Sequence, residues 1–197
     1  MSEIWSIILA AGESTRMKTP KMLLPFNGLT IIEKVIENVG KSVVDKTILV
    51  LGANREKILK VTGHLQVKHC YNENYKQGML SSVICGFRAL PDDYRAVLVI
   101  LGDQPFIGAE IINSVIDAYN RSGKGILMPV FGSKRGHPLL IDRKYRNEIE
   151  KLDPGEGLRS LYRKFTDDVF EVKTENQLIL KDIDTEEDYI NSIKPIN

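Results

Sequence analysis

The chain of 197 residues is 43% hydrophobic and 27% charged, which is typical of globular proteins, and its length suffices for one substantial core. Its 27 Lys and Arg residues nearly balance its 26 Asp and Glu residues, so no overall field of one sign would hold it on a nucleic acid or an anionic membrane. We therefore expect one domain over residues 1–197, with neither of these partners, and any recognition of phosphate must come from a local group of side chains.

From its first residues to the middle, the chain alternates apolar runs with helical patterns. Runs rich in Ile, Val and Leu predict buried strands at Ile4–Ala11, Thr47–Gly52, Ala96–Leu101 and Gly125–Val130. The spacing of apolar residues between them predicts helices at Thr30–Val39, Arg55–Gly63, Leu80–Ala89 and Glu110–Tyr119. A parallel sheet covered on both faces requires such apolar strands and amphipathic helices. The sequence therefore predicts a doubly wound, mostly parallel α/β fold.

The start of the chain and its cysteines indicate a cytoplasmic protein. The run Ile4–Ala11 follows no basic segment and is too short to cross a bilayer, so we interpret it as a strand. Cys70 and Cys85 have neither Cys-x-x-Cys spacing nor a nearby pair of histidines, which argues against a disulfide framework and against a zinc site. We expect two buried thiols in a reducing compartment.

After Pro129 the alternation changes, which predicts an added layer within the same domain. The expected elements are a short strand at His137–Ile141, a polar helix, a glycine-containing turn at Asp153–Gly157 and a strand at Asp168–Val172. The tail predicts a last strand at Leu178–Asp184, followed by a helix with Thr185 as its N-cap and Asp188 as the reciprocal carboxylate. Ligands of such sheets bind at the carboxyl ends of the strands, so the candidate residues are sought there.

The loop after the first predicted strand has the features of a phosphate-binding site. Small residues at Ala10, Ala11 and Gly12 allow a ligand to approach the backbone, whose N–H groups can point at phosphate oxygens. Arg16 and Lys21 add the positive charge that a nucleoside triphosphate needs to bind and to lose pyrophosphate. The loop has neither the Walker A pattern nor the dinucleotide-binding pattern. Either cation alone is better explained as a solvated side chain, but their combination after a buried strand favours phosphate binding.

Two further segments carry candidate metal ligands. Asp103, in Gly102-Asp-Gln-Pro105, ends the strongest internal strand, where a carboxylate can hold a magnesium ion that bridges phosphate oxygens. The same Asp could instead cap the following turn. Asp182 and Asp184 precede the last predicted helix, and Asp184 could complete the magnesium site or cap that helix.

Three segments offer other polar candidates. Ser81 and Ser82, after Gly78, have hydroxyls near a helix N-terminus, where they could contact a nucleotide, cap the helix, or do both. His137 could titrate near neutrality or donate to an acceptor phosphate, although a lone His is more often a packed or capping residue. Arg159 follows the glycine-containing turn and is a candidate to bind the acceptor, as His137 is.

Five of these segments, in order between Ile7 and Tyr189, resemble the MobA-like NTP transferase family. They are Leu9-Ala-Ala-Gly-x-x-x-Arg16-Met followed by Lys21, Gly78-Met-x-x-Ser82, Gly102-Asp-Gln-Pro105, Gly136-His-Pro138 and Asp182-x-Asp184-Thr185. The forms with Ala11, Ser14 and Gly136-His-Pro138 resemble the molybdenum cofactor cytidylyltransferase branch. The sequence departs from this branch at Lys18, where Gly is common, and at Glu156 and Leu158 near Arg159.

The resemblance implies a Rossmann-like domain of the nucleotide-diphospho-sugar transferase type. It implies a Mg²⁺-dependent enzyme that moves a nucleoside monophosphate from CTP to a phosphorylated acceptor, the molybdenum cofactor, with a molybdoenzyme as the recipient of the product. It assigns catalysis to Arg16, Lys21 and Asp103, the metal to Asp103 and Asp184, the acceptor to Gln104, His137 and Arg159, and the nucleotide to Leu9, Ala10, Ala11, Gly12, Ser14, Arg16, Lys21, Gly78, Ser81, Ser82 and Asp103.

Two other functions stay open at this point. An enzyme of the same fold that uses a sugar phosphate or a polyol phosphate would keep the phosphate-binding loop and Asp103. A nucleotide-binding chaperone for a cofactor would bind the nucleotide without releasing pyrophosphate. Transfer at the α-phosphorus needs no protein nucleophile, because positioning and charge neutralisation supply the catalysis.

Overall fold

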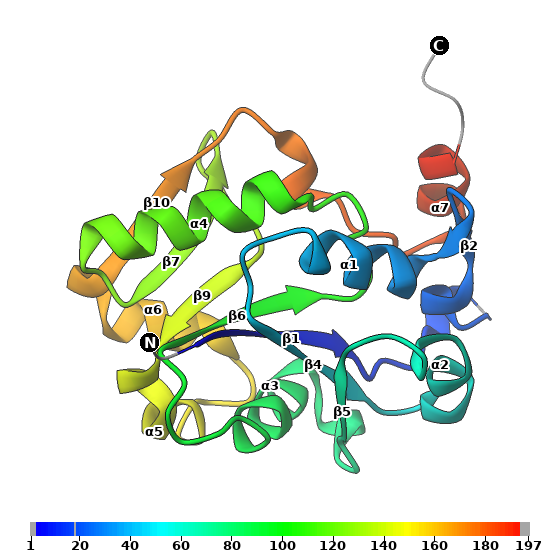
Figure 1. Cartoon of the computed structure of the whole chain (residues 1–197), viewed down its shortest axis with the longest axis horizontal. Coiled ribbons are helices and arrows are strands. Elements are labelled where there is room, and N and C mark those ends of the chain that lie inside the picture. Colours follow the sequence, from blue (N-terminus) through cyan, green and yellow to red (C-terminus); the bar gives the residue numbers. More distant parts are fainter. Residues whose placement is uncertain (1–2, 18, 194–197) are drawn as a thin grey trace.

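The computed structural model describes residues 3–17 and 19–193, and in this part of the chain eight strands form one sheet (Figure 1). The strands are β1 (Ile4–Ala10), β4 (Lys46–Leu51), β5 (Lys68–Tyr71), β6 (Ala96–Leu101), β7 (Ile126–Phe131), β8 (Lys134–Arg135), β9 (Leu139–Asp142) and β10 (Val169–Lys173). Their order along the sheet is β10-β7-β9-β6-β1-β4-β5, and β8 pairs with β7. A separate hairpin joins β2 (Pro25–Phe26) to β3 (Leu29–Thr30).

The centre of the sheet is parallel, as the apolar runs predict. Every residue of β1 is buried, and β1 pairs in parallel with β4 on one side and with β6 on the other. β9 runs antiparallel to both β6 and β7. The connection from β7 through β8 to β9 is too short for a parallel crossover, so β9 pairs antiparallel with β7. The predicted doubly wound, mostly parallel α/β fold is confirmed.

Helices cover both faces of the sheet, and Figure 1 shows α1 and α4 on one side of β1 and β6, with α3 and α5 on the other. The helices are α1 (Ile31–Gly40), α2 (Arg55–Thr62), α3 (Met79–Arg88), α4 (Ala109–Ser122), α5 (Arg146–Ile149), α6 (Leu158–Lys164) and α7 (Glu186–Ile193). Alternate residues of β1 serve the two layers: Ile8 packs with α1 and α4, whereas Ile7 packs with α3 and α6. Among residues 3–17 and 19–193, we find no helix with the length and apolarity needed to span a bilayer.

The four predicted helices of the first half are present with shifted ends. Thr30 is the N-cap of α1 rather than its first residue, and its hydroxyl accepts from the Glu33 N–H while the Glu33 carboxylate accepts from the Thr30 N–H. β5 and the β2–β3 hairpin were not predicted. β5 is only four residues long and half of its residues are exposed, so it lacks a continuous apolar run.

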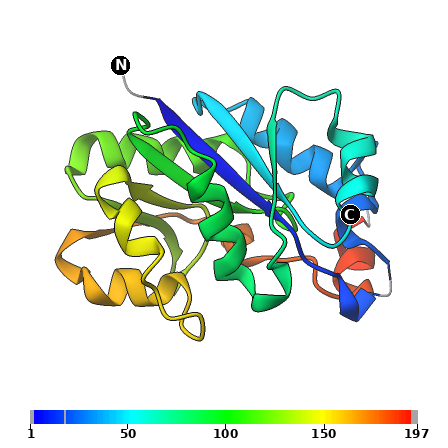
Figure 2. The same ribbon diagram turned by 90° about the horizontal axis from the view of Figure 1, so that it is seen from below.

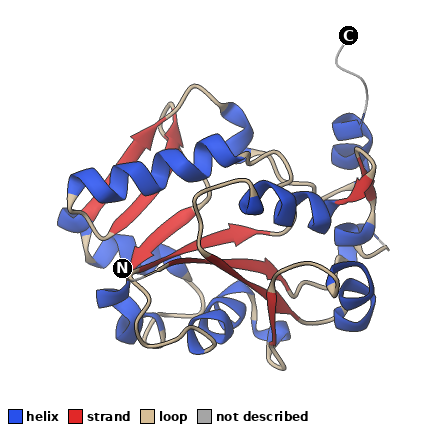
Figure 3. Cartoon of the chain, in the orientation of Figure 1, coloured by secondary structure: helices blue, strands red, loops and turns tan. Residues whose placement is uncertain are grey.

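The predicted tail strand, Leu178–Asp184, is wrong. A 3-10 turn at Gln177–Leu180 replaces its start, and the chain then crosses the end of the sheet as a loop (Figure 3). Its apolar residues are nevertheless buried, because Ile179 packs against the sheet layer and Ile183 packs with Phe26 and Ile31. The apolar pattern therefore reflects anchoring and not strand pairing. α7 follows, with the predicted reciprocal bonds between Thr185 and Asp188.

The two thiols also differ from the prediction. Cys70 in β5 and Cys85 in α3 are half-buried, and their sulfurs lie 3.6 Å apart as free cysteines. Burial raises the pKa of the Cys70 thiol to about 12, and the neighbouring Cys85 acts in the same direction. The sequence spacing could not reveal this contact, because it depends on α3 packing beside β5.

Candidate functional site

The candidate site lies at the carboxyl ends of β1, β4 and β6 (Figure 1), where two glycines let neighbouring segments approach closely. The Gly102 N–H donates to the Leu9 carbonyl at 3.0 Å, and a Cβ on Gly102 would lie 2.8 Å from that oxygen. A Cβ on Gly52 would lie only 2.4 Å from the Ala11 carbonyl oxygen. These close contacts require glycine and place Asp103 beside the end of β1.

The loop after β1 is folded back on itself by Ser14. Ser14 has φ of 55°, which is uncommon for a residue other than glycine, and its Oγ accepts from the Lys21 N–H at 3.1 Å. Short 3-10 turns at Thr15–Met17 and Lys21–Leu23 present the two candidate cations. Lys18, a departure from the family pattern, lies outside the described residues.

A pocket of about 330 Å³ opens between this loop, the Asp103 turn and the start of α3. The predicted residues that line it are Leu9, Ala11, Gly12, Ser14, Arg16, Lys21, Gly78, Ser82, Asp103 and Asp184. Ala10 lies fully buried in β1 behind this lining, and Ser81 also lies outside it. Sequence reasoning missed Thr15, Met22, Tyr75, Met79 and Leu101, which also line the pocket. Met79 lies within the Gly78-Met-x-x-Ser82 segment that indicated nucleotide contact, whereas Tyr75 lies before that segment and carried no such signal.

At the floor of this pocket one ammonium group joins two carboxylates. Lys21 Nζ lies 2.6 Å from Asp103 Oδ2 and 2.8 Å from Asp184 Oδ1, and Arg16 Nη1 lies 3.1 Å from Asp184 Oδ2. Burial lowers the pKa of Lys21, but the two carboxylates outweigh this effect and the pKa is raised. The hydrogen bond from Lys21 lowers the pKa of Asp184. Lys21 and Asp184 are therefore both charged at neutral pH.

Gln104 lies beneath the pocket and not in its lining. Its side chain is buried, and its Nε2 donates to Asp182 Oδ1 at 2.5 Å. Within the described residues, Gln104 Oε1 has no hydrogen-bond partner. The tail is thus fixed twice at this turn, by the contact of Gln104 with Asp182 and by the Ile183 N–H, which donates to the Asp103 carbonyl at 3.1 Å.

A second pocket, of about 490 Å³, contains the other two acceptor candidates, His137 and Arg159. Met79 lines both pockets, which makes them neighbours. Arg135 and Arg163 add positive charge to the second lining. Burial lowers the pKa of His137 to about 4, although the charge of Asp103 acts in the opposite direction. His137 is therefore neutral at pH 7, which favours a packed residue or a hydrogen-bond donor over a group that titrates near neutrality.

The two serines near the start of α3 do not cap the helix. Its N-cap is Gly78, at φ of 95°, without a side-chain capping bond. Ser81 Oγ instead donates within the preceding turn, to the carbonyls of Asn74 and Gly78, and the hydroxyls of Ser81 and Ser82 both accept from Asn72 Nδ2. The serines therefore fix the loop that carries Tyr75.

The donor set at Lys21 suits a divalent cation. Two carboxylate oxygens, from Asp103 and Asp184, lie within hydrogen-bond distance of the same cationic atom. Across residues 3–17 and 19–193, His, Cys, Asp and Glu side chains form no group of three or more that could hold a metal. Mg²⁺ at nucleotide sites commonly takes one or two carboxylates, with phosphate and water completing its shell. Asp184 fits this role better than Asp182, which is bound to Gln104.

Comparison with known proteins identifies the family to which this sequence belongs. A model described as the MobA-like NTP transferase domain matches residues 6–169. A molybdenum cofactor cytidylyltransferase of Escherichia coli (strain K12) is 28% identical over 193 residues, which cover 98% of this chain and 96% of the relative. A probable molybdenum cofactor guanylyltransferase of Methanosarcina acetivorans is 32% identical over 160 residues, covering 77% and 69% of the two chains.

Solved structures share the fold over nearly the whole chain. Rv0371c from Mycobacterium tuberculosis H37Rv superposes with a TM-score of 0.87 at 23% identity and covers 98% of both chains. The same protein has been solved in complex with manganese, with a TM-score of 0.80 at 20% identity, covering 99% of this chain and 100% of that one.

Proposed function

Because this chain belongs to the MobA-like NTP transferase family, we propose that it transfers CMP from CTP to the molybdenum cofactor and releases pyrophosphate. The observation that carries the proposal is the Lys21, Asp103 and Asp184 cluster at the floor of the first pocket. It combines a buried cation for phosphate with a paired carboxylate site for a metal, at the strand ends where this fold class binds ligands.

The first pocket would hold the donor nucleotide. The backbone at Ala11 and Gly12 allows close approach of the triphosphate. The planar guanidinium group of Arg16 has paired N–H donors that can bind two phosphate oxygens at once. Lys21 adds a compact charge on a flexible stem. Ser82 and Tyr75 line the same pocket, which supports their contact with the base or the ribose.

Asp103 and Asp184 would hold Mg²⁺. Bound there, the ion would supply positive charge that neutralises the negative charge developing as pyrophosphate leaves. The M. tuberculosis protein that shares this fold has been solved in complex with manganese, which supports a divalent ion as the cofactor.

The second pocket would hold the acceptor. A phosphate oxygen of the acceptor attacks the α-phosphorus of CTP in line. One P–O bond forms while the bond from the α-phosphorus to the bridging oxygen of the departing pyrophosphate breaks. Arg159, Arg135 and Arg163 can bind an anionic acceptor, and neutral His137 can donate a hydrogen bond to it. Arg16 and Lys21 stabilise the negative charge of the leaving group.

Release of pyrophosphate from each of the four NTPs, with molybdenum cofactor, sugar phosphates or polyol phosphates as acceptors, tests donor, acceptor and reaction together. We expect CTP with molybdenum cofactor to give the highest kcat/KM. Equal or better use of GTP would overturn the donor, and turnover of a sugar phosphate or polyol phosphate would overturn the acceptor. Binding of nucleotide without pyrophosphate release from any combination would instead indicate a cofactor chaperone.

A further inference from the structure

The ammonium group of Lys21 lies at the point where the two carboxylates converge. It contacts Asp103 at 2.6 Å and Asp184 at 2.8 Å, and its side chain is only 13% exposed. We propose that Lys21 holds the metal position in the nucleotide-free chain and that the triphosphate draws it away, so that the metal and the nucleotide bind cooperatively. This inference rests on the proposed function, because it assigns the regulation of metal entry to the same site.

Lys21 and a divalent cation cannot share these carboxylates. The ammonium nitrogen already lies at hydrogen-bond distance from both oxygens, and Mg²⁺ requires carboxylate oxygens at about 2.0–2.1 Å. Two cations that close, in a half-buried pocket, would repel each other strongly. A metal that enters alone must therefore separate Lys21 from Asp103 and Asp184 and leave a buried ammonium without these partners, which is costly.

The bound triphosphate removes this cost. It offers Lys21 new negatively charged partners within the same pocket, and the flexible stem of a lysine allows the ammonium to move to them. The two carboxylates are then free for the metal. Asp182 cannot serve as a substitute ligand without breaking its contact with Gln104. Because coupling of binding free energies is reciprocal, the metal must in turn strengthen nucleotide binding.

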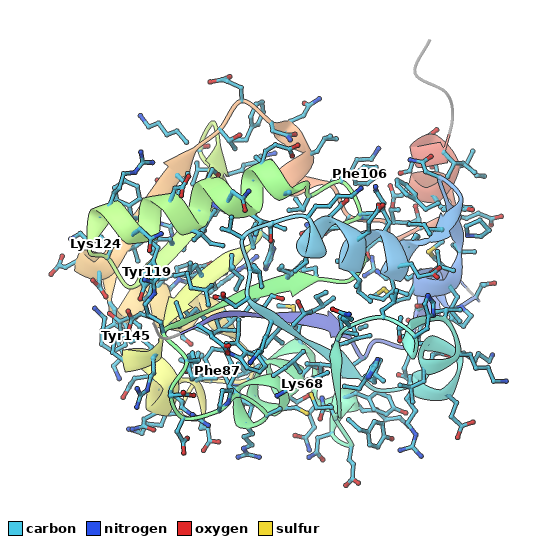
Figure 4. The ribbon with its side chains drawn as sticks, viewed as in Figure 1. Lys68, Phe87, Phe106, Tyr119, Lys124 and Tyr145 are labelled. Atoms are coloured by element: carbon cyan, nitrogen blue, oxygen red, sulfur yellow. The ribbon has the colours of Figure 1, made fainter. Side chains whose placement is uncertain are left out.

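The exchange of Lys21 for a metal ion at the two carboxylates can be tested by titrating the nucleotide-free protein with Mn²⁺. Electron paramagnetic resonance monitors the concentration of the free ion during this titration. Lys21→Met removes the competing ammonium, so we expect it to bind Mn²⁺ on the order of tenfold more tightly than the wild type. The matched control is Lys144→Met, which also removes a lysine from an ion pair, with Asp168 at 2.7 Å. Lys144 covers the ring of Tyr145, at the opposite end of the sheet from the pocket (Figure 4), so Mn²⁺ binding should be unchanged.

The melting temperature provides a second readout. Lys21→Met leaves two carboxylates without their shared cation, so the variant should melt lower than the wild type in chelator and should regain stability with Mn²⁺ alone. Lys21→Gln, which keeps one N–H donor for a carboxylate, gives the same comparison if the Met variant does not fold. In either variant, Mn²⁺ should also strengthen CTP binding less than it does in the wild type, because the competition has been removed.

The outcomes separate this inference from the proposed function. Equal or weaker Mn²⁺ binding by the folded Lys21 variants would overturn the exchange, even if the wild type releases pyrophosphate from CTP. Tighter Mn²⁺ binding by these variants, with no pyrophosphate release by the wild type from any NTP, would support the exchange and overturn the proposed function. Loss of Mn²⁺ binding in Asp103→Asn checks that the titration reports this site.

Discussion

The two carboxylates of the candidate metal site are unequal, although they share one ammonium group. The Asp103 side chain is 17% exposed and follows a central strand, whereas the Asp184 side chain is 33% exposed, lies on the tail and also contacts Arg16. Residues 6–169 match the family model, so Asp103 lies within the matched segment and Asp184 lies beyond it. The site therefore combines a candidate ligand at the end of a central strand with a candidate ligand whose position depends on how the tail is anchored.

Replacing Asp103 by Asn should remove most turnover and leave the fold intact. The amide keeps the size of the side chain but loses the charge, and the loss of a charge-assisted contact corresponds to roughly tenfold to a hundredfold in rate. Pyrophosphate release over a series of Mg²⁺ concentrations measures the effect. Asp168→Asn, which removes a carboxylate paired with Lys144, is the control and should retain activity. Wild-type kinetics for Asp103→Asn at limiting Mg²⁺ would show that the metal assignment is wrong.

The two cations of the loop should respond differently to substitution. Arg16→Lys keeps the charge but loses the planar fork, and Lys21→Ala loses the charge that favours departure of pyrophosphate. We expect losses of roughly tenfold for Arg16→Lys and up to about a hundredfold for Lys21→Ala, because the Arg16 side chain is 70% exposed and the Lys21 side chain only 13%.

Steady-state kinetics, with folding checked by thermal melts, measures both losses. Arg88→Lys is the matched control for Arg16, because Arg88 is 68% exposed and also pairs with one carboxylate, Glu150 at 2.7 Å. Two fully active variants would contradict the phosphate-binding role of the loop.

At the scale of elements, the tail loop decides where Asp184 lies. Ile183 is fully buried with Phe26 and Ile31, and Phe106, labelled in Figure 4, packs edge-on against Phe26 with ring centroids 5.5 Å apart. The Ile183 N–H bonds to the Asp103 carbonyl. One residue of the tail thus connects the apolar cluster to the two candidate metal ligands.

Ile183→Ala should lower both stability and turnover. The lost burial and the cavity should cost about 2–4 kcal/mol in the free energy of unfolding, and a looser tail should misplace Asp184. Urea denaturation and pyrophosphate release measure the two effects. Ile190→Ala in α7 is the control: its side chain is 43% exposed, so a change within about 0.5 kcal/mol is expected. If the two variants are equally stable, Ile183 does not anchor the tail.

The elements that the sequence predicted are those whose pattern reflects local burial. β1 and β6 have continuous apolar runs because both of their faces are covered, and α1 has a complete capping box. The tail was misread because Ile179 and Ile183 are buried by distant elements, which gives an apolar pattern without strand pairing. The position of Ser82 near a helix N-terminus allowed nucleotide contact, capping or both, but its hydroxyl accepts from Asn72, which lies ten positions away and comes close only through the fold.

The same distinction holds for the candidate site. Loop residues such as Gly12 and Arg16 follow a strand in sequence, so their place at its carboxyl end could be predicted. Gln104 lies in a recognisable motif, yet its side chain turns inward to Asp182, which only the tertiary packing reveals. Tyr75 enters the pocket because the segment before α3 meets the β1 loop, and it lies outside the Gly78-Met-x-x-Ser82 pattern that marks this region.

For the whole molecule, the depressed pKa of His137 links stability to pH. An unperturbed histidine has a pKa of 6.5, and burial lowers that of His137 to about 4. Between these values the unfolded chain binds a proton that the native chain does not bind. Stability therefore rises with pH across this window, and His137 makes the native state less stable as the pH falls from 6.5 towards 4.

Replacing His137 by Gln removes this proton uptake, so the variant should lose less stability on acidification than the wild type. We expect the difference in free energy of unfolding between the variant and the wild type to change by about 1–3 kcal/mol between pH 7 and pH 4.5. Each unit of pKa shift corresponds to about 1.4 kcal/mol. Urea unfolding of both proteins at several pH values isolates this contribution, because the carboxylates whose pKa values are lowered, such as Asp184 and Asp168, are common to both. Parallel stability curves for the two proteins would show that His137 is protonated as readily in the native state as in the unfolded one, and its role as a neutral donor in the second pocket would then be wrong.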